Sequence, residues 1–180
     1  MHESVTLTPA VSERDHAAGP SHAALTMVEY GDYQCPACGA AYPVVKALQE
    51  AFPKDLRLIF RNFPLTQSHP YALAAAETAE AAALQGKFWE MHDLLYERQD
   101  LLEPGILASW AQVVDLDLEE FKSALEDGEI VKRIKEDRMS GIKSGVNGTP
   151  TFFINGVRYD GMTDYESMRT AMERMIAGLS

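Results

Sequence analysis

The only two cysteines of the chain, Cys35 and Cys38, are separated by Pro36 and Ala37. Two thiols at this spacing can close a small disulfide ring and open it again, which is the chemistry of thiol–disulfide exchange. An apolar run at residues 25–30 ends shortly before the pair, and a run with helical spacing follows it. We therefore expect the pair at a strand-to-helix turn, where the N–H groups and partial positive charge of a helix start favour the thiolate of the first cysteine. Pro36 suits the first helical position, because no backbone donor is needed there.

Two other interpretations of the cysteine pair stay open, namely half of a zinc site and a pair without chemistry. A structural zinc site normally has four protein ligands. The sequence contains no second Cys-x-x-Cys, and its five histidines show no paired ligand spacing. Redox chemistry is the favoured interpretation, and neither a metal nor a bound cofactor is expected.

The length and net charge of the chain limit the folds and the binding partners that we expect. The chain has 180 residues, of which 46% are hydrophobic, which is enough for one well-packed core. Its net charge of −11 argues against nucleic acid and anionic membrane surfaces as partners. No apolar run approaches membrane-spanning length, so no membrane insertion is expected. The N-terminus lacks the basic and apolar parts of a secretory signal, which predicts a cytoplasmic chain as written, or a periplasmic or other extracytoplasmic one if a signal has been removed.

The elements that would position the cysteines follow a β–α–β order. The strand at 25–30 is followed by a helix that runs to about residue 52, with Pro43 inside it, and then by a strand at 56–63. This order predicts two parallel strands joined by a right-handed crossover.

The remaining sequence completes the predicted domain organisation. Residues 66–144 are rich in alanine and helical periodicity, which indicates an all-helical insertion of about five helices. Residues 145–180 return to strand-forming sequence, with a hairpin at Asn155-Gly156 and a terminal helix. Together with residues 24–65 they are expected to form one α/β domain, preceded by an extended arm at residues 1–23.

Several histidine and tryptophan side chains are expected to have no part in the chemistry. His16 and His22 in the arm are expected to face solvent, and His69 is expected to lie at the surface or to cap a helix. His92 is expected to be a hydrogen-bonded core histidine, and Trp89 and Trp110 are expected to be core residues.

Four stretches of the sequence, at residues 28–38, 60–65, 85–89 and 145–156, together resemble the DsbA-like branch of the thioredoxin-fold disulfide oxidoreductases. The resemblance covers about residues 18–178 and is nearest to small DsbA-like domains that occur alone or fused to sodium/proton antiporters. It implies a thioredoxin-like α/β fold with a mixed sheet of four or five strands and an inserted all-helical subdomain. It also implies exchange with protein or peptide thiols and disulfides, a redox partner that recharges the protein, and no bound cofactor.

The same resemblance assigns roles to individual residues. Cys35 matches the exposed nucleophile, and Cys38 matches the buried resolving thiol. Thr149 and Pro150 match the cis-proline loop that lies beside the disulfide and holds a substrate strand. Glu29 matches a buried acidic residue that assists proton movement at the resolving cysteine. On its residue type alone, Glu29 could equally face water at the edge of a strand.

Two positions, Ala37 and Thr149, depart from the pattern of strongly oxidising members. Both belong to the expected substrate contacts, which are Pro36, Ala37, Thr149 and Pro150. A histidine before the second cysteine stabilises the thiolate in those members, and Ala37 occupies that position here. Its absence predicts a weaker oxidant. Thr149, in place of an apolar residue, resembles reductase- or isomerase-type members, so the direction of electron flow stays open.

Two alternative functions use the same fold. One is a redox-switched peptide-binding or chaperone-like module. The other is an enzyme that uses glutathione, for which the sequence shows no recognisable site.

Overall fold

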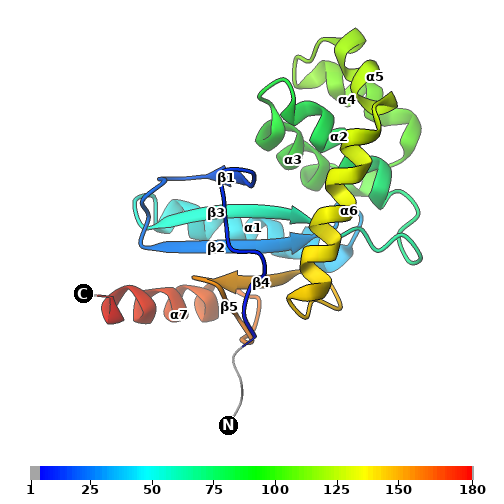
Figure 1. Ribbon diagram of the computed structural model, residues 1–180. Coiled ribbons are helices and arrows are strands. Elements are labelled where there is room, and N and C mark those ends of the chain that lie inside the picture. The colour runs from blue at the N-terminus through cyan, green and yellow to red at the C-terminus, as the bar shows by residue number, and fades with distance from the viewer. Residues whose placement is uncertain (1–4, 180) are drawn as a thin grey trace.

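A computed structural model describes residues 5–179, and within this range the strands form one five-stranded sheet (Figure 1). The order across the sheet is β1-β3-β2-β4-β5. The strands are β1 (His16–Ala18), β2 (Leu25–Gly31), β3 (Leu56–Asn62), β4 (Thr151–Ile154) and β5 (Val157–Arg158). The α-helices are α1 (Pro36–Ala51), α2 (Ala72–Ala83), α3 (Phe88–Glu97), α4 (Leu107–Val113), α5 (Leu118–Glu126), α6 (Gly128–Lys143) and α7 (Tyr165–Gly178).

The two central strands, β2 and β3, carry the predicted β–α–β order. They are parallel, with Glu29 opposite Phe60, and α1 connects them. On the other side of β2, strand β4 pairs antiparallel and places Phe152 opposite Glu29. Strand β1 pairs antiparallel with β3. The mixed α/β sheet predicted from the sequence is confirmed, and Glu29 lies on its central strand.

The sheet buries side chains on both faces, as the alternation of side chains along a strand allows. One face carries residues such as Leu25 and Met27 and packs against α1 and the methionines Met168 and Met172 of α7. The opposite face carries a second cluster that packs against the N-terminal arm and the segment after α6; its buried members are Leu7, Val28, Tyr30, Ile59, Phe63, Val146 and Phe153. As a result, β2 and β3 are each buried at every position but one, although both contain polar residues.

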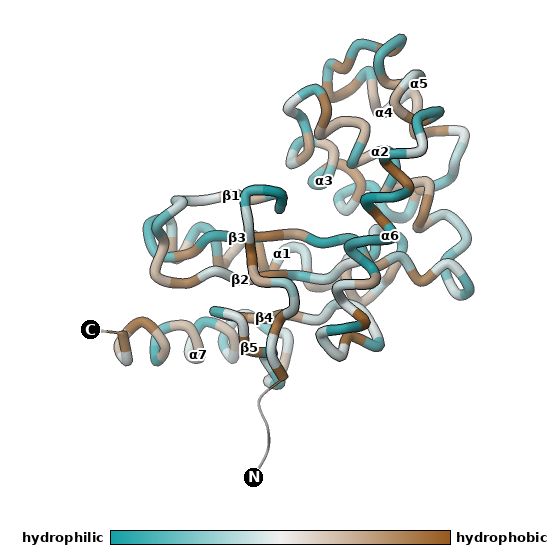
Figure 2. The backbone as a smooth tube through the Cα atoms, viewed as in Figure 1, coloured by the Kyte–Doolittle hydropathy of each residue, from teal (hydrophilic) through white to brown (hydrophobic). Residues whose placement is uncertain are grey.

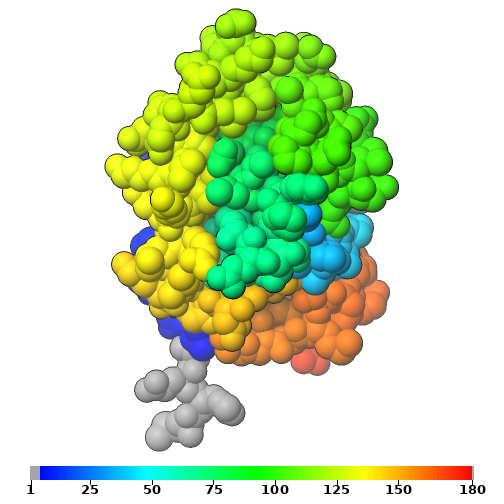
Figure 3. Space-filling view, turned by 90° about the vertical axis from the view of Figure 1, so that its right-hand side faces the viewer, coloured from blue at the N-terminus to red at the C-terminus, as the bar shows by residue number. Residues whose placement is uncertain are grey.

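The helices between β3 and β4 form their own apolar cluster at one end of the sheet (Figure 1). Figure 2 shows hydrophilic and hydrophobic residues alternating along the helices of this block. Cys35 and Cys38 belong to the same cluster as Met91, Leu95 and Trp110 of the helices. Figure 3 shows the blue-to-cyan part of the chain, which includes the start of α1, reaching the surface between the green helical block and the orange C-terminal segment. The cysteines therefore lie where the helical block meets the sheet.

The N-terminal arm contains more structure than the sequence indicated. Strand β1 was not predicted, and His16 within it is not solvent-facing. Its ring stacks on Phe88 with centroids 3.8 Å apart, and Nε2 bonds to Glu80 at 2.8 Å. The prediction that His16 faces solvent was wrong, because its ring bonds to the buried carboxylate of Glu80 on α2. His22 is exposed, as expected.

Two details concern helices. The terminal helix α7 is capped by Asp164, whose side chain accepts a bond from Ser167 N, and not by Thr163 as its spacing from Glu166 suggests. Within residues 5–179, every helix is too short or too polar to cross a bilayer.

Candidate active site

The cysteine pair lies at the N-terminus of α1, as its spacing predicts. Cys35 is the N-cap residue, Pro36 occupies the first helical position, and the Cys35 side chain makes no capping bond of its own. Its sulfur is therefore available to the N–H groups of the first turn. The helix accommodates Pro43 in its interior, as expected.

The two thiols have opposite acid–base character. The pKa of Cys35 is lowered from 9.0 to about 5, chiefly by a hydrogen bond from the Cys38 thiol, with further help from Thr149 and from the backbone N–H groups of Cys38 and Ala37. Burial of Cys35 opposes this shift. The pKa of Cys38 is raised far above its ordinary value, because Cys38 donates to Cys35, is buried and lies near the charge of Glu29. One sulfur is thus poised as a thiolate and the other as a thiol.

The exposure of the two sulfur-bearing residues differs less than the resemblance implied. Cys35 retains 5% of its surface and Cys38 none. The expectation of an exposed Cys35 is wrong in degree, because the helical block and the Thr149 loop cover most of the residue. The flanking residues Pro36 and Ala37 are exposed, so approach to Cys35 is open over the start of α1.

The segment before β4 supplies the other wall of the site. The Thr149–Pro150 peptide bond is cis, and the main-chain oxygen of Thr149 lies 3.6 Å from Cys35 Sγ, from which it accepts a hydrogen bond when Cys35 is protonated. The hydroxyl Oγ1 of Thr149 is buried and has no hydrogen-bond partner in that arrangement. It nevertheless lies close enough to lower the pKa of both cysteines. The Thr149 hydroxyl is therefore free to donate a hydrogen bond to a cysteine thiolate.

Glu29 is buried beneath the cysteines, with 2% of its surface exposed. Burial is the main reason that its pKa rises from 4.5 to about 8, and the charge of Cys35 adds to the rise. Its Oε1 atom is buried without a hydrogen-bond partner. It borders a cavity of about 10 Å³ that Lys46 and His92 also line. The water-facing alternative for Glu29 is wrong, because β3 and β4 flank its strand and side chains of α1 and α3 enclose the small cavity that it borders.

Residues that the sequence analysis did not select also hold the turn before Cys35. Gln99 comes from a short 3₁₀ helix, Gln99–Leu101, and its Nε2 donates to the main-chain oxygens of Tyr33 at 2.9 Å and Cys35 at 2.8 Å. Gly39 leaves room for this amide, because a Cβ atom there would collide with it. No spacing rule links a glutamine to a turn 64 residues earlier in the chain.

His69 is half-buried and bonds to the carboxylate of Asp32 at 2.8 Å, so it is more than a surface residue. His92 and Trp110 are buried in the core as expected, whereas Trp89 is only half-buried. The ring of His92 is buried, bonds through Nδ1 to the Tyr33 hydroxyl at 2.9 Å, and has its pKa lowered to about 3 chiefly by burial. Trp110 is buried, and Trp89 is half-buried with Nε1 donating to Ala17 O.

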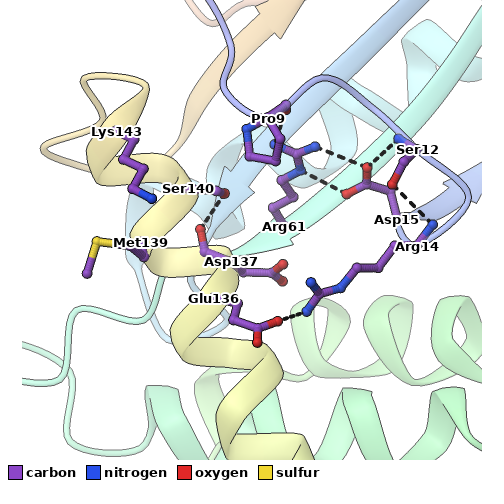
Figure 4. A pocket seen from close by; sticks show the side chains of 10 residues that line it. All are labelled: Pro9, Ser12, Arg14, Asp15, Arg61, Glu136, Asp137, Met139, Ser140 and Lys143. Carbon is purple, nitrogen blue, oxygen red and sulfur yellow. Dashed lines mark hydrogen bonds and ion pairs between the residues drawn. The ribbon is translucent and has the colours of Figure 1, made fainter.

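A separate hollow of about 260 Å³ lies between the N-terminal arm, β3 and α6 (Figure 4). Its buried Arg61 donates to both carboxylate oxygens of Asp15, at 2.8 and 3.0 Å, and to Pro9 O at 3.0 Å. Arg14 pairs with Glu136 of α6. Because these charges are paired with one another, the hollow joins the arm to the sheet and is not a second candidate for chemistry.

Among residues 5–179, no three histidine, cysteine or acidic side chains gather as potential metal ligands. The site consists of the two free thiols of Cys35 and Cys38, the buried carboxyl group of Glu29 and the carbonyl of Thr149. In this reduced state the cysteine pair can exchange with a bound disulfide.

Comparison with known proteins gives the following matches. A family model described as Thioredoxin matches residues 11–174. The chain is 46% identical over 172 residues to a protein of Salinispora arenicola named Na(+)/H(+) antiporter NhaA 1, covering 96% of this chain and 26% of that protein. A protein of the same name from Mycolicibacterium vanbaalenii is 38% identical over 169 residues, covering 93% of this chain and 27% of that protein. The chain thus spans about a quarter of the length of these curated relatives.

Solved structures show the same fold. A thioredoxin-like oxidoreductase from Silicibacter pomeroyi is 28% identical with a TM-score of 0.78, and the match covers 91% of this chain and 92% of that one. BdbD from Bacillus subtilis is 24% identical with a TM-score of 0.84, covering 97% and 99%. The alpha-DsbA1 of Wolbachia pipientis is 21% identical with a TM-score of 0.82, covering 94% and 96%. The two matches below 25% identity support the fold alone.

Proposed function

Because the chain belongs to the thioredoxin family, with the fold of its DsbA-like members, we propose that it is a thiol–disulfide oxidoreductase acting on protein or peptide thiols. Cys35 is the nucleophile and Cys38 the resolving thiol. The observation that carries this proposal is the place of the cysteine pair at the N-terminus of α1, with Cys35 Sγ 3.6 Å from Thr149 O in the loop that contains the cis Thr149–Pro150 bond. The lowered pKa of Cys35 and the raised pKa of Cys38 agree with this arrangement. A thiolate beside a retained thiol is the arrangement that exchange through a mixed disulfide requires.

In the reducing direction, the Cys35 thiolate attacks one sulfur of a substrate disulfide, and the other substrate sulfur leaves as a thiolate. Cys38 then loses its proton and attacks Cys35 Sγ, which releases the second substrate sulfur and leaves the Cys35–Cys38 disulfide. Two electrons pass from the cysteine pair to the substrate. Oxidation of a substrate dithiol is the reverse sequence, and a redox partner of dithiol or disulfide chemistry restores the starting state.

Three neighbouring groups support these steps. Glu29, as a carboxylate, accepts the proton that Cys38 loses, because its pKa of about 8 allows it to change charge near neutral pH. Thr149 Oγ1 donates to the thiolate. The main-chain atoms beside Pro150 receive the extended substrate next to Cys35, and exposed Pro36 and Ala37 form the opposite side of the approach.

The curated relatives are named for antiport, but this chain spans only about a quarter of each, so we propose for it the exchange chemistry of the matched part. We also keep, as a proposal, the division into an arm at 1–23, a thioredoxin-like domain at 24–65 and 145–180, and a helical insertion at 66–144.

The test is turnover of a fluorescent peptide that carries one disulfide, with dithiothreitol as the electron source. If the protein is a catalyst, each chain should reduce many substrate molecules, and Cys35→Ser should lose this turnover. Added metal should not change the rate. Consumption of one substrate molecule per chain, without turnover, would instead indicate a redox-switched binding module and would overturn the enzymatic proposal.

A further inference from the structure

The side chain of Asp32 lies directly before the cysteine turn and is completely buried. Four donors surround its carboxylate. Oδ1 accepts the N–H groups of Gln34 at 2.8 Å and Cys35 at 3.2 Å. Oδ2 accepts the N–H of Leu65 at 2.9 Å and a hydrogen bond from His69 Nδ1 at 2.8 Å. A buried carboxylate is tolerated only with such a complete set of donors.

Among these four donors, His69 is the one side chain. The other three are backbone N–H groups, which side-chain substitution does not remove. His69 lies in the loop between β3 and α2, 37 positions after Asp32, and a fifth of its side chain, 19%, is exposed. It therefore extends from the molecular surface to the buried carboxylate.

The same carboxylate holds the nucleophile's backbone. The N–H of Cys35 is shared between Asp32 Oδ1 and the main-chain oxygen of Asp32, each at 3.2 Å. This arrangement fixes the turn, so that Cys35 Sγ faces the N–H groups of Ala37 and Cys38. The loop has one more bond to the turn, from Tyr71 N to Gln34 Oε1 at 2.7 Å.

We propose that His69 is a positioning residue for thiol exchange, acting through Asp32 on the turn that places Cys35 Sγ over the start of α1. This inference rests on the proposed function of the cysteine pair. Without the His69 donor, the charge of Asp32 is less well balanced and the turn is less firmly held. Both effects disfavour the Cys35 thiolate.

The experiment compares three substitutions of one side chain. His69→Leu removes the donor, His69→Asn keeps an amide N–H near the place of Nδ1, and His69→Gln places its amide near Nε2 instead. The pKa of Cys35 is measured in the reduced protein from the thiolate absorbance against pH, together with the reduction potential. His69→Leu and His69→Gln should raise the Cys35 pKa by about one unit and lower the potential, and His69→Asn should remain near the wild type.

His16 provides a matched control, because it also bonds to a buried carboxylate at 2.8 Å, that of Glu80, whose further partners are Asn62 and Arg133. His16→Leu should destabilise the fold without moving the Cys35 pKa. The proposal is overturned if His69→Leu and His69→Gln leave the pKa and the potential unchanged, or if His16→Leu moves them equally. If His69→Leu does not fold, the difference in Cys35 pKa between His69→Asn and His69→Gln tests the proposal instead. A wild-type protein that cannot cycle between dithiol and disulfide would refute the proposed function, while the thiolate titration would still report on His69.

Discussion

The sulfur of Cys35 lies 3.6 Å from the main-chain oxygen of Thr149, although 114 positions separate the two residues. The contact joins the turn after β2 to the loop before β4, which are neighbours because those strands pair. It leaves the Thr149 hydroxyl buried without a partner, beside two sulfur atoms. Two of the predictions below, for Thr149→Val and Ala37→His, concern the balance between thiol and thiolate at Cys35.

Replacing Thr149 by Val should affect stability and thiol acidity in opposite directions. Burying an unpartnered hydroxyl costs about 1–3 kcal/mol, so its removal should leave the protein equally stable or more stable. The same change removes a group that lowers the Cys35 pKa, which should therefore rise. Urea unfolding and the pH profile of alkylation measure the two effects. A lower Cys35 pKa in Thr149→Val would contradict the role given to the hydroxyl.

Replacing Glu29 by Gln should change how stability depends on pH. The pKa of Glu29 is raised from 4.5 to about 8 in the folded protein, so between these values the folded state binds more protons than the unfolded chain. The free energy of unfolding then falls as pH rises through this window. Glu29→Gln should remove the decline and be more stable than wild type at alkaline pH. Thermal unfolding of the disulfide form, in which Cys35 carries no charge, checks this, and parallel curves for both proteins would refute it.

Introducing histidine at position 37 should make the protein a stronger oxidant. Ala37 is exposed, so an imidazolium fits there and stabilises the Cys35 thiolate. The reduction potential against a glutathione buffer should rise, with about 30 mV for every ~1.4 kcal/mol of added stabilisation. The control is Ala40→His, at another exposed position of α1. A rise of equal size in both variants would show that general charge, and not proximity to the thiolate, sets the potential.

Gly39 and Gln99 should act as one unit. Gly39→Ala should displace the Gln99 amide, because a Cβ atom at position 39 collides with it. Gln99→Leu removes the hydrogen bonds of that amide to the main-chain oxygens of Tyr33 and Cys35. Each change should cost about 1–3 kcal/mol of folding free energy. The double variant should lose less than the sum, because both remove the same interaction. Gln85→Leu is the control, since Gln85 makes comparable bonds to Asp117 within the helical block. Additive losses would show that the two residues act separately.

The sequence predicted those parts of the structure that depend on local pattern. The strand at 25–30, the helix after Cys35 and the hairpin at Asn155-Gly156 follow from apolar spacing, helix-start chemistry and the turn residues. Strand β1 was missed because three residues, His16–Ala18, are too few to show alternation and pair only through contact with β3.

Contacts of the site between residues far apart in the sequence could not be predicted from such local patterns. Burial of Glu29 depends on the central position of β2 between β3 and β4 and on the packing of α1 and α3 beside it, whereas glutamate is by residue type seldom buried. The bonds of Asp32 with His69 and of Gln99 with Cys35 connect residues 37 and 64 positions apart, and no local periodicity encodes them. Single polar side chains that pair across the fold give no repeat for sequence analysis to detect.

The proposed exchange reaction requires different roles for Cys35 and Cys38. Removing the resolving thiol should leave a protein that attacks substrates but cannot release them. The decisive measurement is the recovery of mixed disulfides from cells that express Cys38→Ala or Cys35→Ala, separated on non-reducing gels. Cys38→Ala should carry adducts that vanish on reduction and map to Cys35, and Cys35→Ala should carry few or none. Adducts trapped by Cys35→Ala instead, or full turnover of the reporter disulfide in both variants, would contradict the account.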